Sequence, residues 1–455
     1  MRPTPTTAMR RAGLAAAALA ALLLAGCSSS HPSAGGSTAG HGTGQTTSIA
    51  PSGDSDLVAL DIRIDQGRIG AIAAAGAMPT DSGPDLDASM VLPGLVDTHL
   101  HYAQAGALGS FGRDLLDWLG GAIFPAEASF ADPGVAERTA AFVADRLLAH
   151  GTTTASVFAT VHAHSVDAFF AAAEARGLRM LCGKVLMDRH CPDTLRDTAE
   201  SGRADSQALI ERWHGKGRLG YTLTPRFAPT STREQLQATG ELFASRPDLY
   251  LQTHLAENRA EIDWVRQLFP ERSSYLDVYA HYGLLAPRTI YGHCIHLSDA
   301  ERREMAASGA AAAFCPTSNF FLGSGAFDYA ASTAAGLRVG LATDVGGGTG
   351  FSLIRTLGQA YEASQIHGTQ LSAMRGWYLA TLGGARALYL DDHIGNFQPG
   401  HEADFTVLDW TATPELAWRM DNTHSLAERL FALMILGDER CVVATHVMGE
   451  RVGPG

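Results

Sequence analysis

GLVDTHLHYAQ, residues 94–104, is an apolar run that ends in two histidines, His99 and His101, with Gln104 three positions further on. Side chains two residues apart in a β-strand point to the same face of the sheet. Two imidazoles on one face at the carboxyl end of a strand can form half of a metal site, or they can be rim histidines bonded to backbone. The rest of the chain has to decide between these interpretations.

The composition describes a large globular protein. The 455 residues are 46% hydrophobic and 18% charged, which allows a sizeable core. This length fits one large barrel with a small appendage, or two to three ordinary domains. The formal net charge of −13 argues against a nucleic-acid partner, because such proteins need a basic surface to neutralise phosphates.

From residue 94 onward, short apolar β-rich runs alternate with helical stretches such as residues 134–150 and 299–308. Eight such strands alternating with helices are typical of a (β/α)8 TIM barrel, and we predict a barrel of the metal-dependent hydrolase type over residues 94–395. The predicted strands are residues 94–101, 151–160, 178–186, 219–227, 249–257, 289–297, 309–318 and 338–345.

Both flanks of the barrel have a different pattern. Residues 56–72 alternate like a half-buried strand pair, and residues 403–410 and 441–452 also alternate like strands. We therefore predict a small β-sandwich domain built from both chain ends, residues 56–93 and 396–455.

The first residues have the order of a secretory signal. Arg10 and Arg11 precede an apolar stretch that is too short to span a bilayer, and the sequence LAGC then ends at Cys27. LAGC resembles the lipobox of bacterial lipoproteins. We predict a lipoprotein-type signal peptide over residues 1–26, lipidation of Cys27, and a flexible tether over residues 27–55, which together imply an exported, membrane-anchored protein. The alternative is a start codon placed upstream of the true one, and then the protein is cytoplasmic.

The other five cysteines form no C-x-x-C motif, so neither a thiolate zinc site nor a redox motif is indicated. Their odd number leaves at least one unpaired. We expect buried free thiols at Cys182, Cys191, Cys294, Cys315 and Cys441.

Five metal-ligating side chains fall at the carboxyl ends of predicted strands, where barrel enzymes place their active sites. Three or four neutral imidazoles with one carboxylate suit zinc and leave a position for water. Strand four carries no lysine that could support a bridging carboxylate, and we therefore predict one zinc ion per chain. The ligands are His99 and His101 on strand one, His254 on strand five, His293 on strand six and Asp344 on strand eight.

Glu257 follows His254 by three residues, in HLAEN, and no zinc geometry needs it. A carboxylate beside a metal suits a proton shuttle between water, substrate and leaving group. The alternative for Glu257 is a salt bridge with Arg259 or a charge at a helix N-terminus, and its placement favours the catalytic role.

Some polar residues of similar form are weaker candidates. His162 and His164 repeat the spacing of the opening pair, but they lie past strand two, so we expect a loop or rim feature. His296 is weaker than His293, and Lys184 on strand three is the nearest alternative to the lysine that strand four lacks. The run Gly346-Gly347-Gly348 lacks the lysine and spacing of a phosphate loop and is expected to allow a close backbone approach after Asp344.

Several motifs taken together resemble the guanine deaminases of the amidohydrolase superfamily. PGLVDTHLH and PGHEADFTVLD are general marks of the superfamily, and HYAQ, LLDWLGGAIFPAE, GKVLMDR, TPRFAPTST, THLAEN and CPTSNFFLGSG are more specific. The resemblance covers about residues 56–410. It implies zinc-dependent hydrolysis of guanine to xanthine and ammonia, a step of purine catabolism, by a homodimer.

The resemblance also implies roles for individual residues. Arg226 would hydrogen-bond the carbonyl oxygen of the purine, Gln104 would bond its edge, and Phe227 would pack on the ring, which suits a flat base with a carbonyl acceptor. The implied catalytic residues are Glu257, His293 and Asp344. The implied substrate-binding residues are His101, Tyr102, Ala103, Gln104, Arg226, Phe227, His254 and Asp344.

Two other functions remain open at this point. The same machinery could deaminate a related purine or a pterin, such as 8-oxoguanine or isoxanthopterin, and ammonia release across these substrates would separate them. A non-catalytic, surface-tethered purine-binding lipoprotein is the second. The presence of all five metal positions together with Glu257 counts against a binder, since binding needs no proton shuttle.

Overall fold

The structure is a computed structural model, and it describes residues 60–74 and 90–452. The predicted signal peptide, the tether and the lipidation site Cys27 lie outside the described residues. Within the described ranges, no helix is long and apolar enough to cross a membrane.

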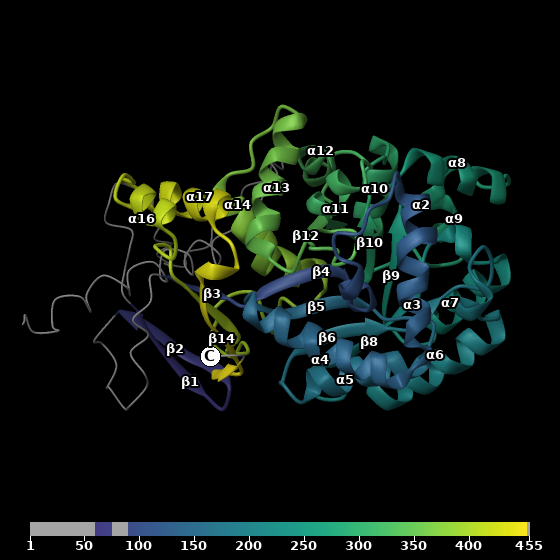
Figure 1. The fold of residues 1–455 in the computed structure, drawn as a ribbon, viewed down its shortest axis with the longest axis horizontal. Helices are drawn as coiled ribbons and strands as arrows, with labels where there is room; N and C mark the ends of the chain where they lie inside the picture. Colours follow the sequence, from purple (N-terminus) through teal and green to yellow (C-terminus); the bar gives the residue numbers. More distant parts are fainter. Residues whose placement is uncertain (1–59, 75–89, 453–455) are drawn as a thin grey trace, which may run out of the picture.

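All eight predicted barrel strands form, and they pair in parallel in chain order (Figure 1). The first and last strands are joined by hydrogen bonds next to the opening motif: the Asp344 amide donates to the His99 carbonyl (2.9 Å), and the His101 amide donates to the Val345 carbonyl (3.2 Å). The predicted TIM-like barrel is therefore confirmed. Its strands are β4 (Leu95–His101), β5 (Thr152–Phe158), β6 (Arg179–Gly183) with its short continuation β7 (Val185–Leu186), β8 (Leu219–Pro225), β9 (Tyr250–Leu255), β10 (Thr289–His293), β11 (Ala311–Phe314) and β12 (Arg338–Leu341).

Amphipathic helices cover the outside of the barrel. The α4 helix shows why they form: Pro133 begins it, the Asp132 side chain accepts a hydrogen bond from the Gly134 amide, and its buried side chains recur at helical spacing. The helices are α4 (Pro133–Ala149), α5 (Ala163–Glu174), α6 (Ala199–Trp213), α7 (Arg233–Ala244), α8 (Arg259–Leu268), α9 (Tyr275–His281), α10 (Asp299–Ser308), α11 (Pro316–Phe321), α12 (Tyr329–Ala334), α13 (Leu353–Ile366), α14 (Ala373–Tyr378) and α15 (Gly384–Ala387).

The chain ends form the expected small β domain. A four-stranded antiparallel sheet has the order β15-β14-β13-β3, and the hairpin β1–β2 packs on it through a cluster that includes Ile69, Phe405 and Val407. Gln66 and Gly67 join the hairpin with positive φ, as a tight two-residue turn requires. Figure 1 shows the purple hairpin beside β14. The strands are β1 (Leu60–Asp65), β2 (Arg68–Ala74), β3 (Met90–Pro93), β13 (Phe405–Leu408), β14 (Val442–Val447) and β15 (Glu450–Val452).

The segment between β13 and β14 departs from the predicted sandwich. It forms two helices, α16 (Pro414–Met420) and α17 (Leu426–Leu436), and α17 packs against α13 and α14 of the barrel. Leu416, Leu430 and Leu433 are buried in the same apolar cluster as the barrel helices. Residues 396–452 are thus divided between the sheet and the outer layer of the barrel.

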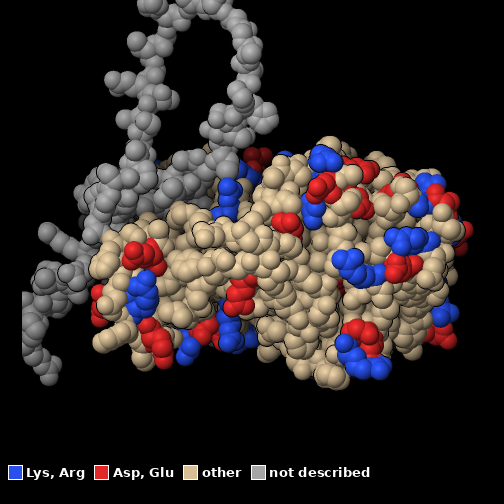
Figure 2. Space-filling model, turned by 90° about the horizontal axis from the view of Figure 1, so that it is seen from above, with Lys and Arg blue, Asp and Glu red and all other residues tan. Residues whose placement is uncertain are grey.

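Figure 2 shows basic and acidic side chains in small neighbouring groups across the face seen from above. The five cysteines of the described residues are buried and free, as the sequence predicts.

Candidate functional site

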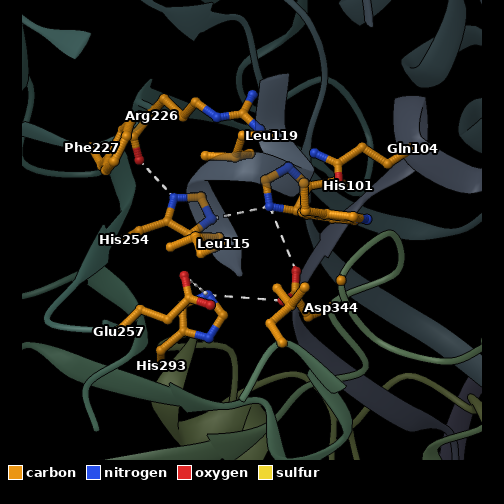
Figure 3. A pocket seen from close by; sticks show the side chains of 13 residues that line it. His101, Gln104, Leu115, Leu119, Arg226, Phe227, His254, Glu257, His293 and Asp344 are labelled. Carbon is orange, nitrogen blue, oxygen red and sulfur yellow. Dashed lines mark hydrogen bonds and ion pairs between the residues drawn. The ribbon is translucent and has the colours of Figure 1, made fainter. Parts of the chain in front are cut away.

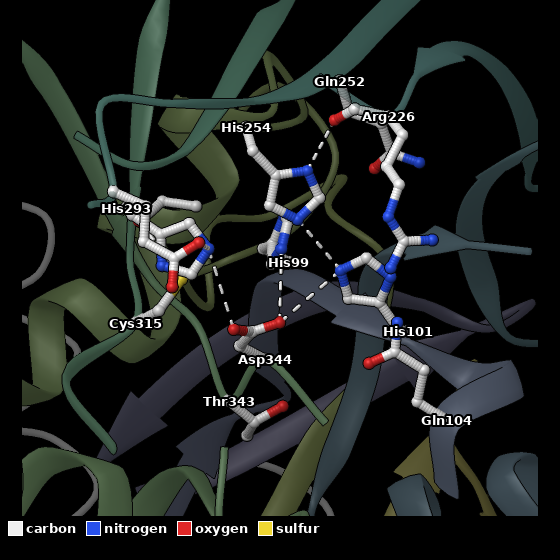
Figure 4. Close-up of polar contacts among 12 residues, drawn as sticks. His99, His101, Gln104, Arg226, Gln252, His254, His293, Cys315, Thr343 and Asp344 are labelled. Carbon is white, nitrogen blue, oxygen red and sulfur yellow. Dashed lines mark hydrogen bonds and ion pairs between the residues drawn. The ribbon is translucent and has the colours of Figure 1, made fainter. Parts of the chain in front are cut away.

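The five predicted metal ligands converge at the carboxyl end of the barrel. His101 Nε2 lies 3.1 Å from His254 Nε2 and 3.6 Å from Asp344 Oδ1 (Figure 3). Asp344 Oδ1 lies 3.3 Å from His99 Nε2, and Asp344 Oδ2 lies 3.8 Å from His293 Nε2 (Figure 4). Side chains from β4, β9, β10 and the segment after β12 therefore share one centre.

Hydrogen bonds to the outer nitrogens aim two imidazoles at this centre. His254 Nδ1 lies 2.6 Å from the Arg226 carbonyl oxygen, which can only accept, so Nδ1 carries the proton and Nε2 keeps its lone pair. His293 Nδ1 lies 2.9 Å from the Asn319 side-chain oxygen and is fixed in the same way. Partners of this kind orient metal-ligating histidines.

The other two predicted histidine ligands, His99 and His101, have buried ring nitrogens without a hydrogen-bond partner in the part of the chain that the structure describes. Both ring nitrogens of His99, and Nδ1 of His101, are buried without a hydrogen-bond partner among the described residues. Buried polar atoms are almost always satisfied, and His99 Nε2, which faces Asp344 Oδ1 at the shared centre, therefore points to a bound ion. Burial, together with neighbouring imidazoles and Arg226, lowers the pKa of His101 and His254 well below the usual value, which keeps their lone pairs available.

The donor set therefore fits a divalent metal. Potential ligand atoms of His99, His101 and His254 lie within 4.8 Å of one another, and those of His99, His293, Asp344 and Cys315 form a second such group. Cys315 was not predicted as a ligand, and it is drawn beside His293 in Figure 4. Imidazole and carboxylate ligands together are typical of zinc and related ions.

The backbone is strained at two ligands. His293 and Asp344 have φ of 68° and 50°, in the left-handed region that residues with a side chain rarely adopt. Asp344 also lies three residues past the end of β12 instead of closing that strand as predicted. Such conformations cost about 1–3 kcal/mol each and persist only where the surroundings fix them, as at functional sites.

Glu257 lines the pocket beside these ligands. Its Oε2 lies 3.4 Å from His293 Nε2, and its Oε1 accepts a hydrogen bond from the Ser324 hydroxyl (3.2 Å). The Glu261 carboxylate holds the backbone in place by accepting from the Glu257 and Asn258 amides. Burial raises the pKa of Glu257 to about 7, which is suited to taking up and releasing protons near neutral pH.

The other side of the pocket is formed by polar and apolar residues that face the ligands. Gln104, Arg226 and Phe227, which are predicted to bind the substrate, all line it. The helix α2 (Leu115–Trp118) and the π-turn Leu119–Ile123 that follows it supply an apolar wall. The wall residues are Leu115, Trp118, Leu119 and Leu322.

A buried carboxylate that the sequence analysis missed joins two of these polar residues. Glu127 lies on the short helix α3 (Phe124–Ala128) and accepts hydrogen bonds from Gln104 Nε2 (2.8 Å) and Arg226 Nη1 (2.8 and 2.7 Å). Its only signal in the sequence is that it is a lone acidic residue in the apolar stretch GGAIFPAEASF.

Two predicted substrate-binding residues have side chains outside the pocket. Tyr102 is buried in the core, where its hydroxyl donates to the Ser165 carbonyl (2.7 Å), and Ala103 belongs to the same apolar cluster. A contact between either residue and a substrate would have to come from the backbone, and it stays a prediction.

The weaker candidates also lie outside the pocket lining. His164 Nε2 bonds the Phe130 carbonyl, and the ring of His162 stacks on it. His296 bonds the Ser324 carbonyl, and the fully buried Lys184 forms an ion pair with Asp197. 

The glycine run makes the close approaches that were expected of it. Gly346 has φ of +117°, and a Cβ atom there would overlap Gln104 Oε1. The Gly348 amide donates to the Asp344 carbonyl (2.5 Å), so the run folds back on the ligand loop.

Comparisons with known proteins identify the family. Residues 90–452 match the amidohydrolase family. The guanine deaminase of Escherichia coli K12 is 48% identical over 368 residues, which cover 81% of this chain and 84% of that protein. The guanine deaminase of Dictyostelium discoideum is 35% identical over 387 residues, 83% of this chain and 85% of that protein.

Solved structures show the same relationship. E. coli guanine deaminase superposes with a TM-score of 0.82 at 45% identity, covering 86% of this chain and 92% of the other. A guanine deaminase from C. acetobutylicum with guanine bound in its active site superposes with a TM-score of 0.80 at 29% identity, covering 87% and 95%. The chain belongs to the amidohydrolase family, whose guanine deaminase members it matches over most of its length.

Proposed function

We propose that the protein is a zinc-dependent guanine aminohydrolase, which converts guanine and water to xanthine and ammonia. The observation that carries the proposal is the arrangement of the pocket. Buried metal ligands and Glu257 occupy one side, and Arg226 and Gln104 present polar groups on the other. The relatives at 48% and 35% identity are guanine deaminases, which supports the same substrate.

The residues that would hold the zinc ion are His99, His101, His254, His293 and Asp344. Bound there, zinc would lower the pKa of a water molecule toward neutrality and so supply a nucleophile for attack on C2 of guanine. The buried His99 Nε2, which has no hydrogen-bond partner among the described residues, and the fixed tautomer of His254 support this assignment.

The chain's own residues position the base and move protons. The Arg226 guanidinium donates to the carbonyl oxygen of guanine, and Phe227 and the wall leucines exclude water from the ring. Glu257 takes a proton from the attacking water and delivers it to the ring nitrogen beside C2. It then takes the remaining proton from the new C2 hydroxyl and delivers it to the amine, which leaves as ammonia. Its raised pKa suits both directions of transfer.

Activity is expected to depend on the bound metal. Removing the metal with a chelator is expected to abolish guanine-dependent ammonia release, and one equivalent of zinc per chain is expected to restore it. His254→Ala should lose zinc and activity, because it removes a ligand whose Nε2 faces the centre. His162→Ala is the matched control, since this histidine lies outside the pocket, and it should keep both.

The substrate is tested by the same assay. Ammonia release and the absorbance change on xanthine formation would be measured with guanine, 8-oxoguanine, adenine and isoxanthopterin. Guanine should have the highest kcat/KM. A zinc-loaded protein that turns over isoxanthopterin or 8-oxoguanine faster would contradict the proposed substrate, and one that turns over none would contradict an enzyme.

Two further proposals rest on the sequence and on the resemblance. The order of charged, apolar and small residues before Cys27 supports an exported protein anchored at the membrane by a lipidated Cys27. Mass spectrometry of the protein from its native membrane fraction should detect a diacylated amino-terminal cysteine, and recovery with an intact amino terminus from the cytoplasm would contradict export.

We also propose a homodimer, which sedimentation would test.

A further inference from the structure

Glu127 is a fully buried carboxylate outside the metal cluster, and it contacts two groups that line the pocket. It receives the Arg226 guanidinium through Nη1 and the Gln104 amide through Nε2. A carboxylate can only accept, so the amide of Gln104 must turn its nitrogen toward Glu127. The bond therefore fixes which end of the Gln104 amide faces which way.

This arrangement leaves a defined set of groups for a ligand. Within the described chain, Nε and Nη2 of Arg226 donate to no protein group, and Oε1 of Gln104 accepts from none. A Cβ atom at Gly346 would overlap Gln104 Oε1, so the glycine is what leaves room for this oxygen. Gln104 is thus held from two sides, by Glu127 and by the glycine.

We propose that Glu127 is a positioning residue that sets substrate selectivity by fixing Arg226 as a donor and Gln104 Oε1 as an acceptor toward the pocket. A rigid donor next to a rigid acceptor matches a heterocycle with a carbonyl oxygen beside a ring N–H, which is a lactam edge. The inference deepens the proposed function, on which it rests, because guanine presents this edge. An aminopyrimidine edge such as that of adenine has the opposite polarity and meets donor against donor.

The charges favour the same assignment. Arg226 is buried, and it lines the same pocket as the metal ligands His101 and His254. A cation in that position opposes the binding of a metal ion, and the Glu127 carboxylate compensates it at hydrogen-bond distance. Glu127 therefore allows a donor of fixed direction to sit beside a cationic centre.

The test measures the binding of two purines that have no amino group at C2 and therefore cannot be deaminated there. The dissociation constants of hypoxanthine, which has the lactam edge, and of adenine would be measured by calorimetry on the zinc-loaded protein. Wild type should prefer hypoxanthine by at least about 10-fold. Glu127→Gln should weaken hypoxanthine about 10- to 100-fold and change adenine by less than about 3-fold, the range for loss of a charge-assisted hydrogen-bond network.

Two other variants separate positioning from folding. Glu127→Asp keeps the charge but withdraws the carboxylate by one methylene, so it should lower the hypoxanthine preference at least about 5-fold with zinc content retained. Glu402 is a buried carboxylate far from this network, and it contacts two arginines at the amino ends of β6 and β8. Its variant Glu402→Gln should lower stability and leave the preference for hypoxanthine unchanged.

Each outcome decides the proposal. Equal weakening of hypoxanthine and adenine in Glu127→Gln would show a merely structural pair, and an unchanged preference in Glu127→Asp would show that charge alone matters. If Glu127→Gln does not fold, Glu127→Asp decides. A wild-type protein that prefers hypoxanthine but does not deaminate guanine would support the positioning role of Glu127 and contradict the proposed guanine deaminase activity. A wild-type protein that deaminates guanine without this preference would contradict only the positioning role of Glu127.

Discussion

Replacing Glu257 by glutamine is expected to lower kcat for guanine by about two to four orders of magnitude, with zinc content unchanged. The amide keeps the size of the side chain and can still bond the Ser324 hydroxyl, but it cannot take up a proton from water. Because Glu257 is placed beside the ligands and is not required to hold the metal, KM should change much less than kcat. Steady-state kinetics and metal analysis on the same preparation provide the measurement.

Glu261→Gln is the matched control for this result. Glu261 is also a fully buried carboxylate, only four residues away, but it bonds backbone amides and the Tyr275 hydroxyl instead of facing the pocket. Its substitution should lower the unfolding midpoint and leave most of kcat, because one amide oxygen of glutamine can still accept from both the Glu257 and Asn258 amides, as Glu261 Oε2 does. A Glu257→Gln protein that holds zinc and keeps more than about a tenth of wild-type kcat would remove Glu257 from the mechanism.

The metal side of the site could be predicted from the sequence because strand ends carry it. Parallel strands of a barrel all present their carboxyl ends at one face, so His99, His254 and His293 must meet once the strands are identified. Each of these ligands can therefore be predicted from the pattern of its own strand. Asp344 was found in the same way, although it lies three residues beyond its strand in a left-handed conformation.

The substrate side could not be derived in this way. Glu127 lies in an insertion between β4 and α4, where a short helix, a π-turn and a second short helix follow no single period. No hydrophobic pattern indicates which way a lone glutamate in such a segment points. The partners of Glu127 lie 23 and 99 residues away, so only tertiary packing brings them together.

The helices α16 and α17 are a second instance of tertiary packing overriding local pattern. The flanking strands β13 and β14 alternate clearly, and this made the whole carboxyl-terminal segment look like one sheet domain. Leu416, Leu430 and Leu433 instead complete the apolar cluster against the barrel helices. The alternating pattern predicts the strands of the sheet. It does not predict which part of the protein an intervening helix packs against, because residues far away in the sequence form that surface.

Replacing Glu402 by alanine is expected to lower the free energy of unfolding by about 3–5 kcal/mol, the usual cost of leaving buried charges uncompensated. Glu402 accepts from Arg179 Nε (2.8 Å) and from Arg218 Nε and Nη2 (3.0 and 2.7 Å), and all three side chains are largely buried. These contacts tie the start of two barrel strands to the segment leading into β13. Chemical denaturation at neutral pH, followed by circular dichroism, would measure the loss.

Acid should remove the same contribution from the wild type. Burial alone would raise the pKa of Glu402, but its bonds with Arg179 and Arg218 outweigh burial and lower it from 4.5 to about 2. A depressed pKa in the folded state means that the stabilisation is present above about pH 4.5 and is lost as the pH falls toward 2. The stability gap between wild type and Glu402→Ala should therefore narrow over this window. Adding Arg179→Met to Glu402→Ala should recover part of the lost stability, because it removes one uncompensated buried charge. A double variant that is destabilised by the sum of the two single variants would show that Arg179 and Glu402 do not interact through charge.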